Sequence, residues 1–574
     1  GTVPDEHSAL YNSPIDIQLS SELRARSFRS GYLPSSTATE MYIRLGADVQ
    51  QFDSNLPVFV VDTLGQEVPG TSTSLFASSI GALFDVQLDG RSSLTMQPAL
   101  ISRIGFKERG SSSSSFPQKP YRVEFRRDDS DADEAVDLLG LPTESDFVMI
   151  PGYDFDRSIN RNTVIYDLSR QAGDYAVRTR YVEVFVNSGR GEVTRADYVG
   201  LYPIMESIKV DENRLDIGKL ATQYSTEPDV TGGYVLKIDR PAPGDTGVTV
   251  GPPGHQLAFQ FVAPEESDVR ANPAQLDYIS DYLTDFLTAL FADDFKHPVS
   301  GLHYSEWVDV PSLIDHYLLY EFWQATDALF FSGHWYKPRD GKLHAGPIWD
   351  FDRGIASTDG RNNDPTGWNV IRSAPIMWPR LFEDIEFRQA LIDRWAELQQ
   401  GALNLDNVLA TFDRITTPLA EAAARNFERW PAVAPRANGG YFGVLDGTWQ
   451  GEVEHMRRAV IARHQWINSL FLPLPQFEFG PAAGNARQFV VSLSGNMAGD
   501  GLTIYYTTDG SDPRLPGGSI SASAQIFASS FVVDSGAVIR ARVFDETFNI
   551  PEAGFEQSVN DAEMWSGLTV LRVG

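Results

Sequence analysis

Two aspartates separated by one aromatic residue, Asp350 and Asp352 in the run Trp349–Asp350–Phe351–Asp352, have the residue types and spacing of a metal site. A third carboxylate, Asp327, lies upstream of them. Hard divalent cations that hold a phosphate-bearing ligand are bound by one or two protein carboxylates. The three aspartates therefore suit a magnesium site that works together with a phosphate ligand.

These carboxylates need a helix and a hairpin to bring them together. Residues 335–337 and 343–348 read as two short strands, and the Asp340–Gly341 pair between them is a strong hairpin signal. If the second strand continues, Asp350 and Asp352 point the same way. An apolar helical run at 311–325 ends just before Asp327. We expect the helix end and the hairpin end to share one cleft, and like charge to raise the pKa of at least one carboxyl there.

A loop rich in glycine and serine precedes another candidate residue. Arg109, Gly110 and Ser111 open a run of serines to Ser115, and Lys119 follows just before a predicted strand. One interpretation is a flexible loop leading into an edge strand. The other is a phosphate cover, in which backbone N–H groups and hydroxyls wrap an anion and Lys119 contacts it. Composition alone favours the flexible loop.

Charge and composition exclude several classes of protein. Lys and Arg number 47 against 77 Asp and Glu, a net charge of −30, which repels nucleic acids and anionic membranes. The chain has no cysteine, so disulfides, zinc–thiolate sites and cysteine nucleophiles are excluded. No apolar run reaches the roughly 20 residues of a membrane span. The sequence opens without a basic and apolar leader, so we expect any signal peptide to be missing from it.

The pattern of elements predicts an α+β protein with a β-rich beginning, a helical lobe and a small antiparallel β-sandwich at the end. At 574 residues the chain is too long for one core. We predict an N-terminal segment and β-rich lead-in at 1–104, a mixed domain that includes the helical lobe at 105–473 and the sandwich at 474–574. The acidic run at 126–137 reads as a solvated loop. The predicted strands lie at 41–45, 56–63, 84–88, 99–108, 147–150, 181–186, 198–205, 233–238, 489–493, 502–507, 530–533 and 538–544. The predicted helices lie at 158–172, 271–293 and 311–325, and the stretches 373–427 and 451–471 are predicted to be mainly helical.

Abundant aromatic residues and acidic pairs also fit a glycosidase, in which one carboxylate serves as acid and another as base or nucleophile. The sequence contains no GxxxxGK[ST], GxGxxG, HExxH or GxSxG motif. The glycosidase is the leading alternative from the residues alone.

Several stretches together resemble the spore-coat protein H (CotH) kinase family of atypical, secretory-type protein kinases. The resemblance covers about 56–471, and its order and spacing are specific. Its carriers are LPVFVVDT, RGSSSSSFPQKPYRVEF, LLGLPTESDFVMIPGYDFDRSINRN, RTRYVEVFVN, GLYPIMES, TGGYVLKID and WYKPRDGKLHAGPIWDFDR.

The resemblance implies roles for individual residues. Asp327 matches the phosphotransfer aspartate and Asp350 the metal-binding aspartate, with Asp352 a second metal residue or a structural partner. Lys119 is the candidate phosphate-contacting lysine and Glu206 the acidic residue that orients it. The candidate nucleotide contacts also include Arg161, Arg109 and Ser111. The implied cofactors are ATP and Mg²⁺ or Mn²⁺, and the implied partner is a protein with Ser or Thr acceptors.

Two departures from the family pattern keep a second function open. Ala325 stands where the family commonly has asparagine, and Lys237 stands where an acidic residue is usual. A pseudokinase that serves as a cell-surface structural or attachment protein is therefore the alternative.

The C-terminal stretch YYTTDGSDP and the later VIRARVFD resemble the chitobiase/β-hexosaminidase C-terminal type of sandwich. Such modules accompany exported bacterial enzymes, so the resemblance implies a secreted or surface-located bacterial protein. Asp509 and Asp512 are turn residues first, with Ca²⁺ binding as a further possibility.

Overall fold

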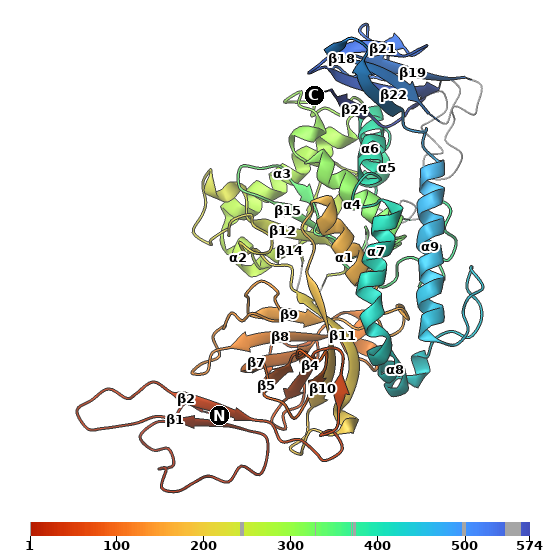
Figure 1. Cartoon of the computed structure of the whole chain (residues 1–574). Helices are drawn as coiled ribbons and strands as arrows, with labels where there is room; N and C mark the ends of the chain where they lie inside the picture. Colours follow the sequence, from red (N-terminus) through yellow and green to blue (C-terminus); the bar gives the residue numbers. More distant parts are fainter. Residues whose placement is uncertain are drawn as a thin grey trace. The chain divides into compact units, whose positions relative to one another are not determined.

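The computed structural model describes residues 2–241, 246–327, 329–368, 370, 375–495, 501–545 and 564–573. The chain forms two compact units. Unit 1 consists of Gly1–Asp167, Val177–Asp216 and Thr411–Met456, and unit 2 of Leu168–Ala176, Ile217–Ala410 and Arg457–Gly574. Both units mix helices and strands, so the predicted α+β class is confirmed (Figure 1).

The elements of unit 1 are mainly strands. They are β1 (Ser21–Ala25), β2 (Ala38–Tyr42), β3 (Asp53–Ser54), β4 (Val58–Asp62), β5 (Ala77–Phe84), β6 (Ser92–Ser93), β7 (Leu100–Glu108), β8 (Tyr121–Arg126), β9 (Asp146–Met149), β10 (Thr179–Asn187), β11 (Tyr198–Glu206) and α8 (Ala420–Arg429). Three helices have residues in both units: α1 (Arg161–Ala172), α7 (Leu405–Thr416) and α9 (Trp449–Ser469).

Unit 2 contains a sheet with helices, followed by the C-terminal strands. Its first elements are β12 (Tyr234–Ile238), β13 (Val248–Val250), β14 (Leu257–Ala263), α2 (Glu266–Ala271), α3 (Pro273–Phe291), α4 (Val310–Phe322), β15 (Gly333–Lys337), β16 (His344–Ala345), α5 (Met377–Leu381) and α6 (Ile385–Leu398). The C-terminal strands are β17 (Gln476–Ala482), β18 (Asn485–Ser494), β19 (Leu502–Thr507), β20 (Gln525–Ile526), β21 (Phe531–Asp534), β22 (Val538–Asp545), β23 (Met564–Trp565) and β24 (Thr569–Arg572).

The core of unit 1 is a closed barrel with the strand order β10-β11-β9-β8-β7-β5-β4. Neighbouring strands are antiparallel except at the closure, where β4 runs parallel to β10. Alternate residues of these strands point inward and fill the barrel with aliphatic and aromatic side chains. The predicted domain boundary at residue 105 falls within β7, and β4 and β5 from before that boundary belong to the same barrel.

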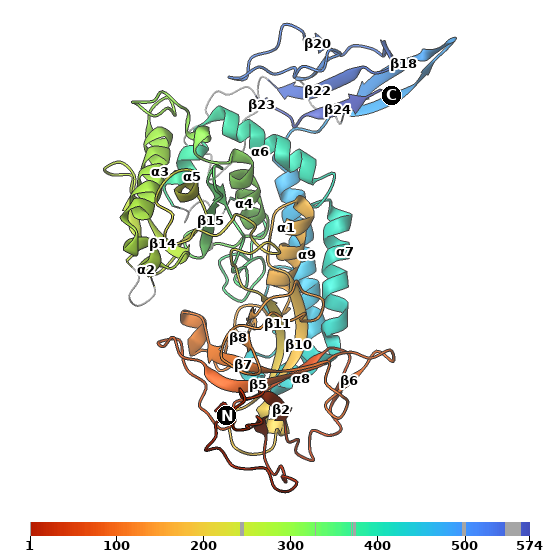
Figure 2. The same ribbon diagram turned by 90° about the vertical axis from the view of Figure 1, so that its left-hand side faces the viewer.

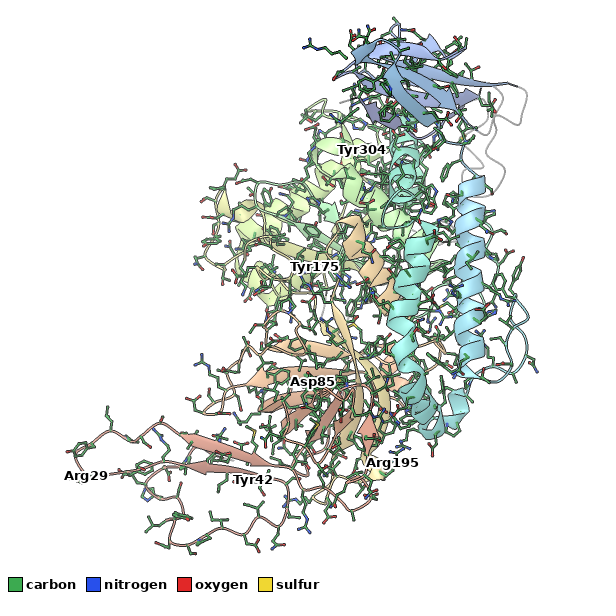
Figure 3. All side chains as sticks on the ribbon, in the orientation of Figure 1. Arg29, Tyr42, Asp85, Tyr175, Arg195 and Tyr304 are labelled. Carbon is green, nitrogen blue, oxygen red and sulfur yellow. The ribbon has the colours of Figure 1, made fainter. Side chains whose placement is uncertain are left out.

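A hairpin of β1 and β2 projects from the barrel, with Arg29 in the loop between its strands (Figure 3). Arg24 of this hairpin donates to the backbone carbonyl of Asp128 at 2.8 Å. Arg103 of β7 pairs with Asp131 at 2.8 Å. The acidic run that was predicted to be solvated therefore joins the hairpin to the barrel through these contacts.

Most predicted elements overlap an element of the structure, but β1, β13 and β14 were not predicted, β16 is shorter than the strand predicted at 343–348, and one strand of the barrel is misplaced. The strand predicted at 84–88 is instead β5, which ends at Phe84, and Leu88 lies in a turn and is fully exposed. The period-2 pattern at 84–88 continues past the end of the strand, so the pattern alone did not reveal where pairing stops.

Unit 2 is built on a five-stranded antiparallel sheet with the order β13-β14-β12-β15-β16. Helix α4 begins at an Asp309 N-cap whose carboxylate accepts from the Ser312 N–H. All of its residues from Ser312 to Phe322 are buried, and Asp315, His316 and Glu321 are among them.

The buried charges of α4 all require partners. Arg463 of α9 donates to the Glu321 carboxylate at 2.7 Å, and both side chains are 0% exposed. The same guanidinium donates to the carbonyls of Glu321, Pro365 and Gly367. This ion pair thereby fixes the end of α4 and the segment 365–367 together.

A second buried acidic group lies beside α4. Asp315 accepts two hydrogen bonds from Arg394 of α6, at 2.6 and 2.8 Å. Asp174 lies next to Asp315, and burial together with the Asp315 carboxylate raises the pKa of Asp174 to about 7, against the opposing charge of Arg394.

The C-terminal strands form two sheets, β17-β18-β21 and β20-β19-β22-β23 with β24 on β22. The sandwich packs on α6, because Ile392 of α6 is buried within its apolar core (Figure 2). Arg542, 2% exposed, joins Asp393 of α6 to Asp512 of the sandwich. The Arg542 guanidinium donates to both Asp512 carboxylate oxygens. It therefore occupies the oxygens that Ca²⁺ would need as ligands.

We predict that Arg463→Met destabilises the protein by roughly 3–5 kcal/mol, because it leaves the Glu321 carboxylate buried without its cation. The double variant Arg463→Met/Glu321→Leu should recover part of this loss, since apolar groups replace both charges. Urea unfolding of the three proteins measures the effect. Equal stability of the single and double variants would show that the pair does not act as a unit.

The raised pKa of Asp174 predicts that the free energy of unfolding changes between about pH 4 and 7. The folded state keeps the Asp174 proton up to about pH 7, whereas the unfolded chain loses it near pH 4. The free energy of unfolding should therefore fall as pH rises through this window and level off above it. Asp174→Asn should be more stable than the parent at pH 8, by roughly 1–3 kcal/mol. Parallel curves for parent and variant from pH 4 to 8 would contradict the assignment.

Candidate active site

Asp327 follows the end of α4 in unit 2, as the helical run predicted. The helix ends at Phe322, and the backbone turns at Gln324, which has a φ of 49°. Asp327 is partly exposed, and Arg353 donates to its Oδ2 at 3.3 Å. Arg361 donates to both of its oxygens. The side chain therefore lies beside the loop that follows the Trp349–Asp350–Phe351–Asp352 run.

The loop that carries Asp350 and Asp352 is not a strand, which corrects the strand argument made from the sequence. β15 and β16 form the predicted hairpin with Tyr336 opposite His344, but β16 ends at Ala345. Gly346 has a φ of 126° and Asp350 a φ of 69°, and neither angle is compatible with a strand. The two aspartates are positioned by turn geometry, and their spacing does not make them point the same way.

Helix α4 holds this loop through Tyr320 and Trp323. The Tyr320 hydroxyl donates to the Trp349 carbonyl and accepts from the Trp349 N–H, each at 3.1 Å. The Tyr320 ring stacks on Phe351, with centroids 4.4 Å apart. The Ile355 N–H donates to the Trp323 carbonyl at 2.6 Å. These bonds bring the Asp350–Asp352 loop to the chain segment that contains Asp327.

Asn362 is a site residue that the sequence analysis missed. It is 1% exposed, and its amide donates to the carbonyls of Gln324, Arg353 and Gly354. The Asn362 backbone carbonyl accepts from the Ala356 N–H at 3.1 Å. One buried amide thus links the end of α4 to the loop after Asp352. No motif marks Asn362, because its role depends on where three distant carbonyls converge.

Backbone conformations with positive φ gather in this region. Gln324, Ser332, Asp350 and Ala356 have φ between 49° and 69°. The Ser332 hydroxyl also donates to Asp350 Oδ2 at 3.3 Å. Such conformations cost of order 1 kcal/mol or more for residues other than glycine and cluster at functional sites. Their presence supports a positioned site around Asp327 and Asp350.

Neighbouring charge sets the direction in which the pKa of Asp327 is shifted. We expected repulsion to raise the pKa of at least one carboxyl. For Asp327 the reverse holds: the Arg361 guanidinium, with Arg353, lowers the pKa of Asp327 below its ordinary value. Two guanidinium groups close to one carboxylate outweigh the effect of burial. Asp327 is therefore ionised throughout the neutral range.

The donor groups fit Mg²⁺ that is shared with a phosphate ligand. Asp350 is exposed and Asp352 half-buried, and both offer the hard oxygens that Mg²⁺ prefers. Within the described ranges, no group of three or more His, Asp or Glu side chains is arranged to hold a metal alone. Mg²⁺ bound by one or two carboxylates takes its other ligands from water and substrate phosphates. The residues therefore fit that mode and not an all-protein cage.

The glycine–serine loop is an ordered turn in unit 1. Residues Ser112–Ser115 form a 3₁₀ turn, and the Ser114 hydroxyl donates to the Ser111 carbonyl at 2.7 Å. Gly110 has a φ of 92°, and a Cβ there would lie 2.2 Å from Ser113 Oγ. Arg109 N–H donates to the Pro120 carbonyl at 3.0 Å, and Lys119 Nζ donates to the Ser114 carbonyl at 2.6 Å. The loop thus closes on itself around Lys119.

Glu206 pairs with arginines of unit 1. It is fully buried at the end of β11 and accepts from the Arg178 side chain at 2.7 Å, with Arg214 at 4.0 Å. The barrel register aligns Glu206 with Phe147 and Phe147 with Val123, and Lys119 lies four residues before Val123. Four residues of extended chain span about 13 Å. The predicted closeness of Lys119 and Glu206 is therefore wrong.

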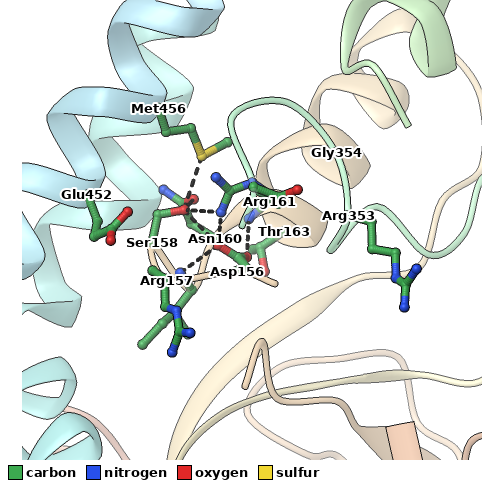
Figure 4. A network of polar contacts seen from close by, with 12 residues as sticks. Asp156, Arg157, Ser158, Asn160, Arg161, Thr163, Arg353, Gly354, Glu452 and Met456 are labelled. Atoms are coloured by element: carbon green, nitrogen blue, oxygen red, sulfur yellow. Dashed lines mark hydrogen bonds and ion pairs between the residues drawn. The ribbon is translucent and has the colours of Figure 1, made fainter. Parts of the chain in front are cut away.

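Arg161 is buried in the network that Figure 4 shows. Its side chain is 1% exposed and donates to Asp156, and to Ser158 Oγ at 2.9 Å. Ser158 also bonds to Asn160 Oδ1 at 2.8 Å. Asp156 accepts from the Ile159 and Arg161 N–H groups before α1. This burial favours a role for Arg161 in shaping the turn into α1.

Comparisons with known proteins come down to two family models. The model described as "CotH kinase protein" matches residues 106–467, well over half of the chain. A second model, described as "Fn3 associated", matches residues 492–552 within the C-terminal strands. The more specific resemblance to the chitobiase type of sandwich is not confirmed. No curated protein matches this sequence. Among the described helices, none has the length and apolar character to cross a membrane.

We predict that Asn362→Ala loosens the loop that follows Asp352. The substitution leaves three carbonyls without their donor, at a cost of about 1–3 kcal/mol. Urea unfolding measures the global effect, and trypsin cleavage after Arg353 or Arg361 reports local opening. Gln223→Ala, at an exposed amide in the same unit, is the control. Unchanged stability together with unchanged cleavage would contradict the role of Asn362.

Proposed function

This chain belongs to the CotH kinase family, and we propose that it is an atypical protein kinase. It transfers the γ-phosphoryl group of ATP to Ser or Thr hydroxyls of a protein substrate. The observation that carries this proposal is the joining of Asp327 to the Asp350–Asp352 loop. Arg353, which follows Asp352 directly, donates to Asp327, and α4 binds the loop on both sides of Phe351.

Each carboxylate has a separate role in the proposed reaction. Asp350, with Asp352, holds Mg²⁺ on the nucleotide phosphates, and the ion when bound offsets the charge of the phosphoryl group. Asp327 accepts a hydrogen bond from the acceptor hydroxyl and orients it toward the γ-phosphorus. Its lowered pKa keeps Asp327 ionised, so the carboxylate can accept the hydrogen bond of the acceptor hydroxyl.

The candidate residues of unit 1 receive different support. Lys119, Arg109 and Ser111 belong to one compact glycine–serine turn, which supports their role as nucleotide contacts. Arg161 and Glu206 are buried with charged partners, which supports a role in positioning the chain around the nucleotide. The Lys–Glu pairing expected between Lys119 and Glu206 is not part of this proposal.

A second candidate function is a pseudokinase that binds nucleotide without transferring phosphate. Ala325, which is 2% exposed, replaces the asparagine common in the family. If that asparagine holds a second metal in the family, this chain lacks the ligand and its transfer activity is reduced or lost. Both Asp327 oxygens also already accept hydrogen bonds from Arg361. In this case the protein serves as a structural or attachment protein at the cell surface. The module at 492–552 supports export for either function.

Single substitutions separate the proposed roles. Asp350→Ala should abolish Mg²⁺-dependent ATP binding, because it removes a direct metal ligand. Asp327→Asn should keep ATP binding within about 3-fold while transfer falls by at least about 100-fold, since only the orienting group is lost. Calorimetry with Mg-ATP and transfer of ³²P from γ-labelled ATP to casein measure the two effects.

Asp281→Asn, at an exposed position of α3 in the same unit, is the charge-matched control and should behave as the parent. Melting temperatures detect the competing explanation, in which these aspartates only cap turns at about 1 kcal/mol each. An Asp350→Ala protein that melts early but binds Mg-ATP like the parent would refute the metal assignment. Parent protein that binds ATP without transferring phosphate would favour the pseudokinase.

A further inference from the structure

Two arginines and two aspartates form a connected cluster beside the candidate site. Arg361 donates to Asp359 through Nε and Nη2, the latter at 2.7 Å from Oδ2. It donates to Asp327 through Nη1 and Nη2, the latter at 2.9 Å from Oδ2. Arg353 Nη1 lies 3.3 Å from Asp327 Oδ2 and 3.4 Å from Asp359 Oδ2. Both guanidiniums therefore contact both carboxylates.

The members of this cluster differ in exposure. The Asp359 side chain is 7% exposed, whereas those of Arg361, Arg353 and Asp327 are 45%, 32% and 28% exposed. Asp359 is thus the buried anchor, and the arginines and Asp327 face solvent. A guanidinium has two edges that can each bind an oxyanion in a bidentate manner. Asp359 holds one edge of Arg361, and the other edge points toward Asp327.

The backbone around Arg361 is firmly held. Its neighbour Asn362 is buried and bonded to three carbonyls, and Ser357 Oγ donates to Asn362 Oδ1 at 3.2 Å. The Asp359 N–H donates to Ser357 Oγ at 3.3 Å. A guanidinium on such a support loses little further freedom when it binds a ligand. A surface ion pair that binds no ligand contributes little to stability, so stability alone does not account for this rigid support.

We propose that Arg361, assisted by Arg353, binds the γ-phosphoryl group of ATP through the edge that contacts Asp327 in this structure. This inference rests on the proposed kinase function and deepens it. A terminal phosphoryl group carries more charge than one carboxylate and matches the guanidinium fork, so it displaces Asp327 from that edge. Asp359 keeps the other edge in place.

The exchange also prepares Asp327 for its role. When the phosphoryl group takes this edge of Arg361, an Asp327 oxygen becomes available to the acceptor hydroxyl. The acceptor oxygen forms a bond to the γ-phosphorus while the bond from the γ-phosphorus to the β–γ bridging oxygen breaks. The hydroxyl proton leaves toward Asp327, and ADP carries the electron pair of the broken bond. Arginines that stabilise this charge accelerate related transfers by about 10³-fold or more.

The ratio of ATP to ADP affinity tests the contact directly. Calorimetry with Mg-ATP and Mg-ADP on the full chain should show a preference for ATP in the parent. Arg361→Ala should reduce that preference by about 10-fold or more, and Arg361→Lys should restore it only in part because lysine lacks the fork. The kcat of Arg361→Ala should fall more than its KM rises. Arg270→Ala is the control, since Arg270 is 41% exposed and pairs with Glu266 in the same unit.

The outcomes distinguish this inference from the proposed function. If Arg361→Ala keeps the parent's ATP preference and transfer rate while Asp327→Asn is inactive, the kinase stands and the Arg361 contact is refuted. If the parent neither binds ATP nor transfers phosphate, both fail. If Arg361→Ala loses the preference in a parent that binds ATP without transfer, the contact stands in a pseudokinase. Should Arg361→Ala fail to fold, Arg361→Gln and Arg361→Lys give the same comparison.

Discussion

The buried ion pair between Glu321 and Arg463 is the constraint on which the candidate site of unit 2 depends. Both side chains are fully shielded from water, and the guanidinium also binds three backbone carbonyls at the end of α4 and at 365–367. A fully buried charge is stable only when it keeps its partners, so this ion pair fixes where α4 ends. Asp327 follows the end of α4 after one short turn, so the fixed helix end also positions Asp327.

From that fixed end, a series of polar contacts builds the site outward. Tyr320 holds Trp349 and stacks on Phe351, Trp323 binds Ile355, and Asn362 binds carbonyls of both segments. None of these groups carries out chemistry in the proposed reaction. They replace strand pairing as the means of positioning Asp350, and a site held by side-chain bonds tolerates the left-handed backbone that Asp350 adopts.

The balance between kinase and pseudokinase turns on the charge around Asp327. Two arginines lower the pKa of this carboxyl and occupy its oxygens. Without a phosphate ligand they neutralise the group expected to orient the acceptor. When a phosphate ligand is bound, the same arginines can bind its phosphoryl group, which carries more charge than Asp327. One set of side chains thus accounts for an inactive and an active arrangement, and the ligand decides between them through its charge.

Sequence patterns predicted the α+β class, the hairpin of β15 and β16, the helix before Asp327 and the membership of the family, because periodicity, turn residues and motif order are local properties. The remaining features follow from how the chain folds in three dimensions. The tertiary structure made Asp350 part of a left-handed turn, joined β4 and β5 to the barrel across the predicted boundary, and paired Glu206 with Arg178. It also brought Arg361, Asp359 and Asn362 to Asp327. Those contacts join residues far apart along the chain, and their partners are chosen by burial and charge, which no spacing in the sequence records.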